Sequence, residues 1–411
     1  MAGPTVIASG SALAVKLYSV ALFNESLRLS TFRRNLTGPA PKQSSAEMLA
    51  KGQTSPDYPF VTITDLSSGP GDDVSIDLFN ILTGRATMGD KKLAGRLMGL
   101  TSSSMDLKIN QCRGGVETGG RMSQQRTRHN LRSIAKANLG GWNARLYDQL
   151  ASVHVAGARG TSDDNEWIVP VTSDPDFADI TINAVVAPTV NRRFFASDAT
   201  SVTNLDTADI LTLKDLDKLR MTLGEQAFTI QPIRLEGDLQ ADEDPLYVLY
   251  VSERVWYNIQ ISTTGQNWRT FLAAAYERSK DFKHPLFMGS PGMWAGILVK
   301  KMRRAIRFSS GDTVVEYDGS NVAQNVTAAV GFDRSILLGG QALAIAYGNA
   351  QGAGNSDGYH FSWHEEMTDH DNIREISSAS MSGMAKIRFT GSDGAPTDHG
   401  VATIDSYAPT T

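Results

Sequence analysis

"SQQRTRHNLRSIAKANLGGWNARLYDQLASV", residues 123–153, carries the longest helical pattern in the chain. Its apolar side chains recur at steps of three and four residues, so they form one stripe along a helix. Gly140 and Gly141 weaken helix propensity, and we expect a bend or a close neighbour at that point. The pattern predicts a helix over about 122–153 with these core positions: Leu131, Ile134, Leu139, Trp142, Leu146 and Leu150.

Two segments before this helix alternate apolar and polar residues, which is the period of half-buried strands. The first is 73–82, where Val74, Ile76 and Leu78 share one face, and the second is 105–112. They predict a hairpin, but the connection from 83 to 104 is far longer than the usual loop of roughly 2 to 5 residues. A loop of that length typically binds something, and it concentrates the basic residues Arg85, Lys91, Lys92 and Arg96.

The chain after the helix mixes strands and helices. We predict a helix over 213–223 that Thr212 and Asp215 cap together, a buried strand over 245–251, and a helix that begins at Ser252. A helix over 267–282, a strand over 296–302 and a strand followed by a helix over 335–348 come next. Further strands are predicted over 359–365, 384–389 and 400–407, so the fold class is α+β.

Composition excludes several classes of protein. The chain has 411 residues and a net charge of −5. This negative charge argues against a protein whose main function is to bind nucleic acid. Cys112 is the only cysteine, so no disulfide forms within one chain and no cysteine-based zinc site exists. The N-terminal segment lacks a basic start and a long apolar run, and we therefore expect no targeting segment and no membrane association.

The segment "WHEEMTDHD", residues 363–371, is the best candidate for chemistry. A helical zinc site needs a second histidine four residues after the first, but position 368 is threonine. As a strand, the segment places His364 and Glu366 on one face and Glu365 on the other. We predict no catalytic residue, no metal and no cofactor, and we keep open a metal-dependent hydrolase centred on His364, Glu366 and His370.

Several blocks of sequence, in order, resemble the major capsid proteins of tailed bacteriophages, especially the family typified by the N4-like phages. The blocks are 119–160, 245–256, 284–301, 335–349 and 361–408, and the resemblance covers the chain from about residue 60 to its end. The order of features is similar too, because a polar arm, a long hairpin excursion, a long helix, a mixed α/β unit and closing strands follow one another.

The resemblance implies the tailed-phage capsid shell fold, with a long spine helix and peripheral sheet, an axial α/β domain, an extended hairpin loop and an N-terminal arm. Its parts here are an arm at 1–56, the extended loop at 57–118 and the peripheral domain with the spine helix at 119–204. The axial domain covers 205–350, and the return strands of the peripheral domain cover 351–411. In that family the extended loop reaches over the neighbouring subunit, so the four basic loop residues are expected to contact acidic residues of the next copy.

The function that the resemblance implies is a non-enzymatic major capsid protein. Its copies assemble as hexamers and pentamers into an icosahedral shell that encloses double-stranded DNA without sequence-specific binding. Portal and scaffolding proteins are the expected partners and a decoration protein is left open, with assembly in the host cytoplasm and a final place in the virion. We expect a retained N-terminal arm, a separate scaffolding protein and no covalent crosslink.

Two further alternatives remain at this point. The shell of a bacterial protein compartment has the same fold and encloses cargo enzymes, so a co-purified enzyme in place of DNA distinguishes it. A nucleic-acid-binding module that uses the arginines of the long helix is the other, and the net negative charge opposes it.

Overall fold

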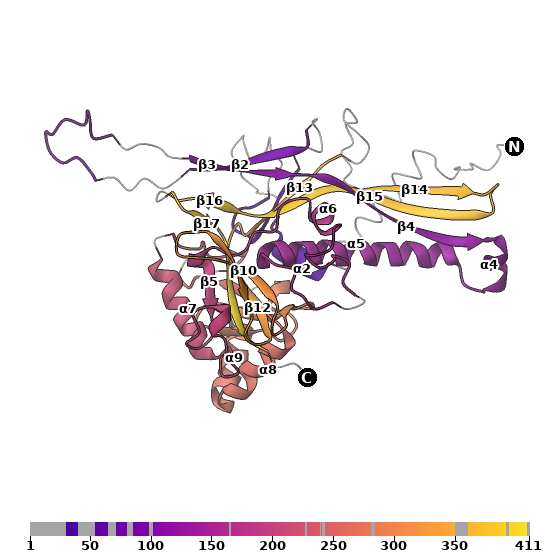
Figure 1. The fold of residues 1–411 in the computed structure, drawn as a ribbon. Coiled ribbons are helices and arrows are strands. Elements are labelled where there is room, and N and C mark those ends of the chain that lie inside the picture. Colours follow the sequence, from indigo (N-terminus) through magenta and orange to yellow (C-terminus); the bar gives the residue numbers. More distant parts are fainter. Residues whose placement is uncertain are drawn as a thin grey trace.

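The computed structural model describes residues 30–39, 54–64, 71–79, 85–97, 102–163, 166–226, 228–238, 240, 243–280, 284–349, 361–391 and 394–408. Two sheets form its framework, and a long helix, α5 (Leu131–Ala156), runs beside both (Figure 1). A narrow hairpin and the far end of one sheet extend from this framework in opposite directions. Most of the predicted arm at 1–56 lies outside the described residues. Tyr359 of the predicted strand 359–365 also lies outside them.

The spine helix begins later than the sequence pattern predicts. A separate short helix, α4 (Arg121–Arg126), ends at Thr127, whose backbone is extended, and α5 begins after Asn130. The Asn130 side chain accepts a hydrogen bond from the backbone N–H of Ser133, which satisfies a donor that the first helical turn leaves unpaired. The prediction of one helix over 122–153 is therefore wrong at 127–130, whereas the helix continues through Gly140 and Gly141.

The stripe of the spine helix is buried along only part of its length. Leu139, Leu146 and Leu150 are buried, and Leu131 and Trp142 are half-buried. Ile134 is 43% exposed and is not a core residue of the subunit. The first turns of α5 extend beyond the axial sheet and have the narrow peripheral sheet along one side, so a side chain that points away from this sheet meets solvent (Figure 1).

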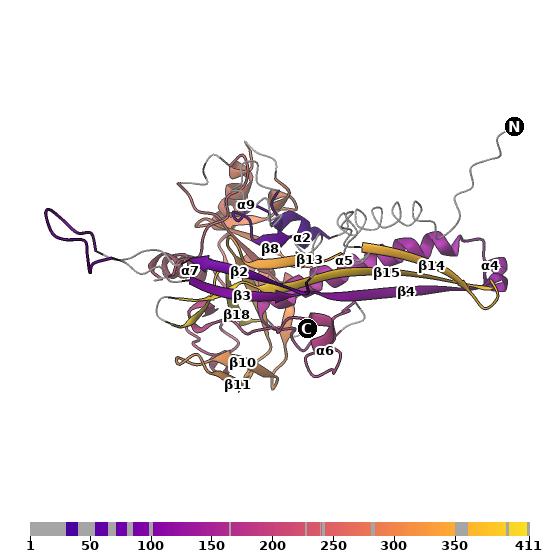
Figure 2. The ribbon, with the colours of Figure 1, turned by 90° about the horizontal axis from the view of Figure 1, so that it is seen from above.

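The peripheral sheet contains five strands and is built around β15 (Ile373–Lys386). On one side β15 pairs antiparallel with β4 (Asn110–Gly120), and on the other it pairs antiparallel with β14 (Phe361–Thr368) and, further along, with β13 (Leu343–Tyr347). β1 (Phe60–Ile63) pairs parallel with β13 and completes the sheet. The long strands β4, β14 and β15 follow α5 toward α4 (Figure 2).

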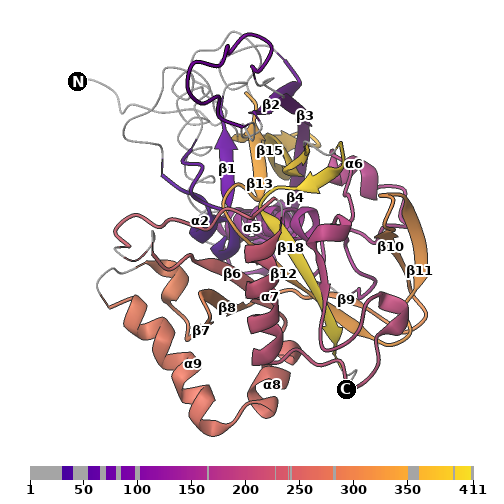
Figure 3. The same cartoon turned by 90° about the vertical axis from the view of Figure 1, so that its left-hand side faces the viewer.

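The axial sheet contains seven strands and lies between two layers of helix. One face packs against α5, and the other packs against α7 (Leu213–Glu225), α8 (Glu253–Ser262) and α9 (Gly265–Arg278). α8 and α9 lie at the bottom of the axial domain in Figure 3, whereas β2 and β3 lie at the top of the view. The strands are β5 (Arg193–Phe195), β18 (Val401–Tyr407), β12 (Phe332–Leu338), β6 (Tyr247–Val251), β8 (Ile297–Lys301) and β7 (Gly292–Trp294), with β9 (Ile306–Phe308) on β12.

Several local predictions for this domain are confirmed. Thr212 donates its backbone N–H to Asp215 Oδ2 at 2.8 Å, which is half of the predicted capping box at the start of α7. Ser252 Oγ accepts from the backbone N–H of Val255 at the start of α8. The apolar run at 245–251 forms β6, which is buried along its whole length.

The prediction of a strand followed by a helix over 335–348 is wrong, because both halves of this segment are strands. The first half ends β12 and the second forms β13, with a turn at Gly339 and Gly340 between them. Every residue of β13 is buried. Because both faces of this alanine-rich strand are covered, its sequence lacks the apolar–polar alternation that identifies a half-buried strand.

Two strands exchange domains relative to the predicted boundaries. β13, predicted as part of the axial domain at 205–350, lies in the peripheral sheet, and β18, predicted as a peripheral return strand, pairs with β12 in the axial sheet. Besides the passage from β4 through α5 to β5, the chain therefore crosses between the two sheets after Leu338 and again before Val401. The other predicted boundaries stay predictions.

Smaller elements complete the described chain. They are α2 (Thr31–Leu36), α6 (Phe177–Thr181), the pairs β10 (Thr313–Tyr317) with β11 (Ala323–Thr327) and β16 (Arg388–Thr390) with β17 (Pro396–Asp398), and 3₁₀ turns at Val190–Arg192, Val202–Asn204 and Pro285–Phe287. Among the described helices, none is long and apolar enough to cross a membrane.

A buried ion pair joins the axial sheet to the spine helix. Arg334 of β12 donates Nε and Nη2 to the two carboxylate oxygens of Asp405 on β18, each at 2.7 Å, and both side chains are fully buried. Arg334 also donates to the carbonyl of Ala156 at the end of α5. Burial lowers the pKa of Arg334, but the charge of Asp405 and its hydrogen bonds outweigh burial and hold that pKa above its usual value.

We expect Asp405→Asn to lower the free energy of unfolding of the unassembled subunit by about 3–5 kcal/mol, because the buried guanidinium loses its charged partner. Urea denaturation followed by circular dichroism measures the change. Glu253→Gln is the matched control, since Glu253 pairs with Lys301 on the surface and its loss costs less than about 1 kcal/mol. Equal effects of the two substitutions contradict this prediction.

His154, near the end of α5, predicts a pH dependence of stability. Burial, together with the charge of Lys386, lowers its pKa to about 4, whereas the carbonyl of Thr181 opposes the shift. Between pH 6.5 and 4 the unfolded chain binds a proton at this position that the folded chain does not, so stability falls as the pH falls. We expect a loss of about 3 kcal/mol across that window that is absent in His154→Gln. Identical pH profiles of the two proteins contradict the assignment.

Candidate inter-subunit surfaces

The extended hairpin consists of β2 (Asp73–Phe79) and β3 (Ser102–Lys108). The strands are antiparallel, with Val74 opposite Leu107 and Ile76 opposite Met105, so the predicted alternation is confirmed. Val74 and Leu107 pack against buried residues of β13, β15 and β16, including Ala344. The base of the hairpin is therefore fixed on the peripheral sheet, and its other end projects away from the subunit (Figures 1 and 2).

We call residues 85–97, at the far end of this hairpin, the basic tip. It turns at Gly89 and Gly95, whose φ angles of 65° and 82° lie in the left-handed region, and these positions favour glycine. The four predicted contact residues Arg85, Lys91, Lys92 and Arg96 are all exposed on it. Three large apolar side chains are exposed there as well: Met88 (73%), Leu93 (58%) and Leu97 (75%).

The basic tip lies outside the subunit's core. Its described residues form no ion pair with any other described residue, although four of them are cationic. Large apolar side chains that one subunit leaves in water are typical of an interaction site. The sequence pattern did not lead us to predict these three apolar residues as exposed. Their position in an unusually long loop is the feature of the sequence that could have indicated it.

Polar side chains join α5 to the far half of the peripheral sheet. Glu365 of β14 is 5% exposed and accepts two hydrogen bonds from Arg132 of α5, at 2.8 and 2.7 Å, and one from Arg374 of β15 at 2.5 Å. Burial raises the pKa of Glu365, but the two arginines outweigh burial and hold it below its usual value. Asn143 donates to Ser378, so α5 carries polar contacts to β15 as well.

The cluster at 363–371 does not assemble a metal centre. His364 Nε2 lies 3.5 Å from Glu366 Oε2 on one face of β14, and Glu365 lies on the other face, as predicted. His370 lies in the turn between β14 and β15, where its φ is 53°. No group of three histidine, cysteine, aspartate or glutamate residues is placed to hold a metal ion within the described part of the chain.

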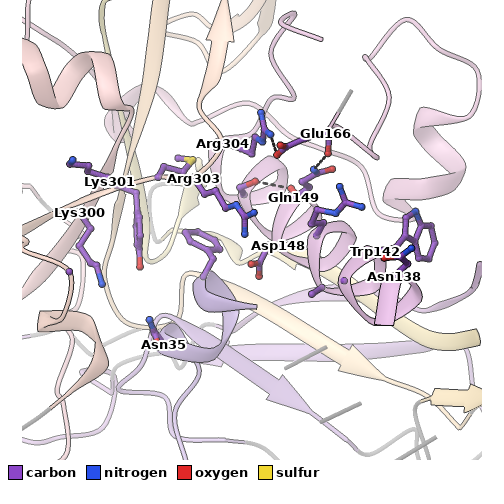
Figure 4. A pocket seen from close by; sticks show the side chains of 18 of the residues that line it. Asn35, Asn138, Trp142, Asp148, Gln149, Glu166, Lys300, Lys301, Arg303 and Arg304 are labelled. Carbon is purple, nitrogen blue, oxygen red and sulfur yellow. Dashed lines mark hydrogen bonds and ion pairs between the residues drawn. The ribbon is translucent and has the colours of Figure 1, made fainter. Parts of the chain in front are cut away.

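The structure also contains a groove of 1080 Å³ between α2, α5, β4 and residues 288–304 (Figure 4). Arg304 forms an ion pair with Glu166 at its edge, and Gln149 donates to the carbonyl of Glu166 at 2.8 Å. Burial raises the pKa of Asp148, which accepts one hydrogen bond from Ser30 and one from the backbone N–H of Arg33. Many of the polar groups that line the groove therefore bind one another, as they do in a junction between structural elements.

Apolar side chains are also exposed on the helices of the axial domain. Tyr276 of α9 is 73% exposed, and Tyr257 and Ile261 of α8 are 60% and 59% exposed. Met221 of α7 is 57% exposed. The single subunit therefore leaves apolar side chains in solvent both at the basic tip and around these helices.

Comparison with known proteins connects this architecture to one family. A model of a family described as phage capsid protein matches residues 6–410. The major capsid protein of Pseudomonas phage KPP25 is 24% identical over 339 residues, which cover 80% of this chain and 82% of that protein.

Solved structures share the fold. The capsid of Ralstonia phage GP4 superposes with a TM-score of 0.70 at 24% identity and covers 99% of both chains. The capsid of cyanophage Pam1 has a TM-score of 0.60 at 18% identity and covers 90% of this chain and 95% of that one. The capsid of Helicobacter pylori bacteriophage KHP30 has a TM-score of 0.56 at 13% identity, with 89% and 92% covered.

We expect Glu365→Gln to weaken the far half of the peripheral sheet by about 1–3 kcal/mol, because two arginines then face each other without an anion between them. Hydrogen exchange of the β14 amides in the unassembled subunit measures this local change. Glu366→Gln, on the opposite face of the same strand, is the control and does not speed the exchange, because it removes only a repulsion with Glu375. Faster exchange in the control than in Glu365→Gln contradicts the role of Glu365.

Proposed function

The chain belongs to the phage capsid protein family, and on that premise we propose that it is the major capsid protein of a tailed bacteriophage. Its copies assemble as hexamers and pentamers into an icosahedral shell that encloses double-stranded DNA. The fold is the tailed-phage capsid shell fold, with α5 as the spine helix. The family match favours this function over a bacterial compartment shell and over a hydrolase at His364.

The observation that carries this proposal is the basic tip. A hairpin that is fixed at its base and exposes Met88, Leu93 and Leu97 at its end has a surface that only another molecule buries. Obligate interfaces often bury roughly 2,000–5,000 Å², and a projecting hairpin adds contact area that two rounded domains lack. Many such contacts, repeated around a ring, stabilise a shell even where each one is modest.

The remaining partners follow from this role. We expect a portal protein and, during assembly, a scaffolding protein, with the chain synthesised in the host cytoplasm and retained in the virion. The net charge of −5 suits enclosure of DNA without sequence-specific binding, because a strongly cationic lining would hold phosphates tightly. Its role is structural, without catalysis.

We expect replacement of residues 88–97 by a short Gly-Ser linker to leave a folded subunit and to reduce the yield of closed particles by roughly tenfold or more. Negative-stain electron microscopy with light scattering measures the yield, with the scaffolding protein co-expressed. Circular dichroism of the two subunits checks that the deletion leaves the fold intact. Closed particles at the wild-type yield contradict a role of the tip in assembly.

A further inference from the structure

Three glutamates form a row across the far end of the peripheral sheet. Glu366 of β14 lies directly opposite Glu375 of β15, and Glu375 lies directly opposite Glu117 of β4. Directly opposed residues of neighbouring strands project to the same face, with Cβ atoms about 4.5–5.5 Å apart. All three side chains are exposed, and we call them the glutamate row.

The subunit itself does not compensate this row. Like charges directly opposite each other destabilise a sheet. Within the described residues, no lysine or arginine forms an ion pair with the three glutamates: Glu375 accepts a hydrogen bond from Thr368, and Glu366 lies 3.5 Å from His364. On the opposite face of the same strands, Arg132 and Arg374 bind Glu365. The arginines thus neutralise the face toward α5 and leave the outer face acidic.

Other charged groups near the glutamate row do not change the negative charge of this face. Asp369 and Asp371 are exposed in the turn at the end of β14 and add negative charge. Arg121 is close, but it donates Nε to the backbone carbonyl of Asp371. Arg113 is exposed four residues from Glu117 along β4. The end of the sheet therefore carries five carboxylates with these two arginines near them.

The basic tip has the complementary charge and lies at the other end of the molecule. The tip projects on one side of the framework, and the end of β14 and β15 lies on the other (Figures 1 and 2). The two surfaces cannot meet within one subunit, so their contact joins two copies head to tail. A head-to-tail contact of this kind generates a ring when the rotation between copies closes.

We propose that the glutamate row of one subunit is the docking site for the basic tip of a second copy. Lys91, Lys92 and Arg96 bind the three carboxylates and remove the repulsion between them, and the apolar residues of the tip cover the adjoining sheet surface. This inference rests on the proposed assembly into a shell and identifies the acidic residues that the tip contacts. The fit is one of charge: the tip has four basic residues against one acid, Asp90.

A disulfide between the two surfaces tests the contact. Lys91→Cys and Glu375→Cys are combined in a Cys112→Ser background, particles are assembled and oxidised, and the chains are separated by denaturing electrophoresis without reductant. A disulfide needs Cα atoms within about 7 Å, so these two positions crosslink only between copies. We expect a ladder of covalent multimers from particles and a monomer band from unassembled subunits.

A matched pair controls for non-specific oxidation. Lys91→Cys with Asp179→Cys places the second thiol at another exposed acidic position, on α6, and we expect no ladder from it. Shells that form without a ladder from the Glu375 pair, or that give a ladder only from the control pair, overturn the docking site and leave the proposed function intact. Failure of the wild-type chain to form shells with its scaffolding protein overturns the proposed function itself.

A charge exchange tests the energetic part of the inference. We expect Glu375→Lys to reduce particle yield by roughly tenfold, because the tip then meets a cation. Adding Lys91→Glu and Lys92→Glu to this variant restores most of the yield, whereas the same two tip substitutions alone reduce it. Absence of restoration, with all variants folded by circular dichroism, contradicts an electrostatic contact between the two surfaces.

Discussion

Tyr147 of α5 donates a hydrogen bond to Ser380 of β15 at 2.5 Å, and its hydroxyl lies 3.0 Å from that of Ser382. All three side chains are buried, and burial raises the pKa of Tyr147 to about 12, so the hydroxyl keeps its proton. A buried polar group without a partner is costly, which means that a shift of the helix along the strand breaks bonds that water does not replace. The position of the spine helix on the peripheral sheet is fixed in this way, and the rest of the subunit is arranged around it.

The same helix reaches the axial domain at its other end. Arg334 binds both Asp405 and the carbonyl of Ala156, so the strand pair β12 and β18 is joined to the C-terminal end of α5. A second buried carboxylate, Asp398, accepts from Lys386 and Arg388, which lie at the end of β15 and in β16. Each carboxylate is buried with its own cationic partners, so neither is left uncompensated in the low-dielectric interior. The first of these contacts joins the axial sheet to α5, and the second joins β15 of the peripheral sheet to the β16–β17 pair.

The result is a subunit with buried ion pairs at its centre and exposed charged surfaces at its ends. The hairpin β2–β3 is anchored by Val74 and Leu107 and carries the basic tip outward, while β14 and β15 carry the glutamate row in the opposite direction. Opposite charges at opposite ends favour contact between copies over contact within one copy. Family membership and this distribution of charge lead to the same picture of a repeating shell.

The sequence by itself determined the local structure wherever one face of an element is buried and the other is wet. Alternation predicted β2 and β3, and side-chain caps predicted the starts of α7 and α8 at Thr212 and Ser252, because these signals lie within a few residues of one another. It also identified the basic loop, and Glu365 and Glu366 were placed on opposite faces of one strand. Only the tertiary structure decided the break before Asn130, the strand at 343–347 and the exchange of β13 and β18 between sheets. It alone also aligned Glu117 with Glu375, because register between distant strands is set by packing and leaves no local pattern in the sequence.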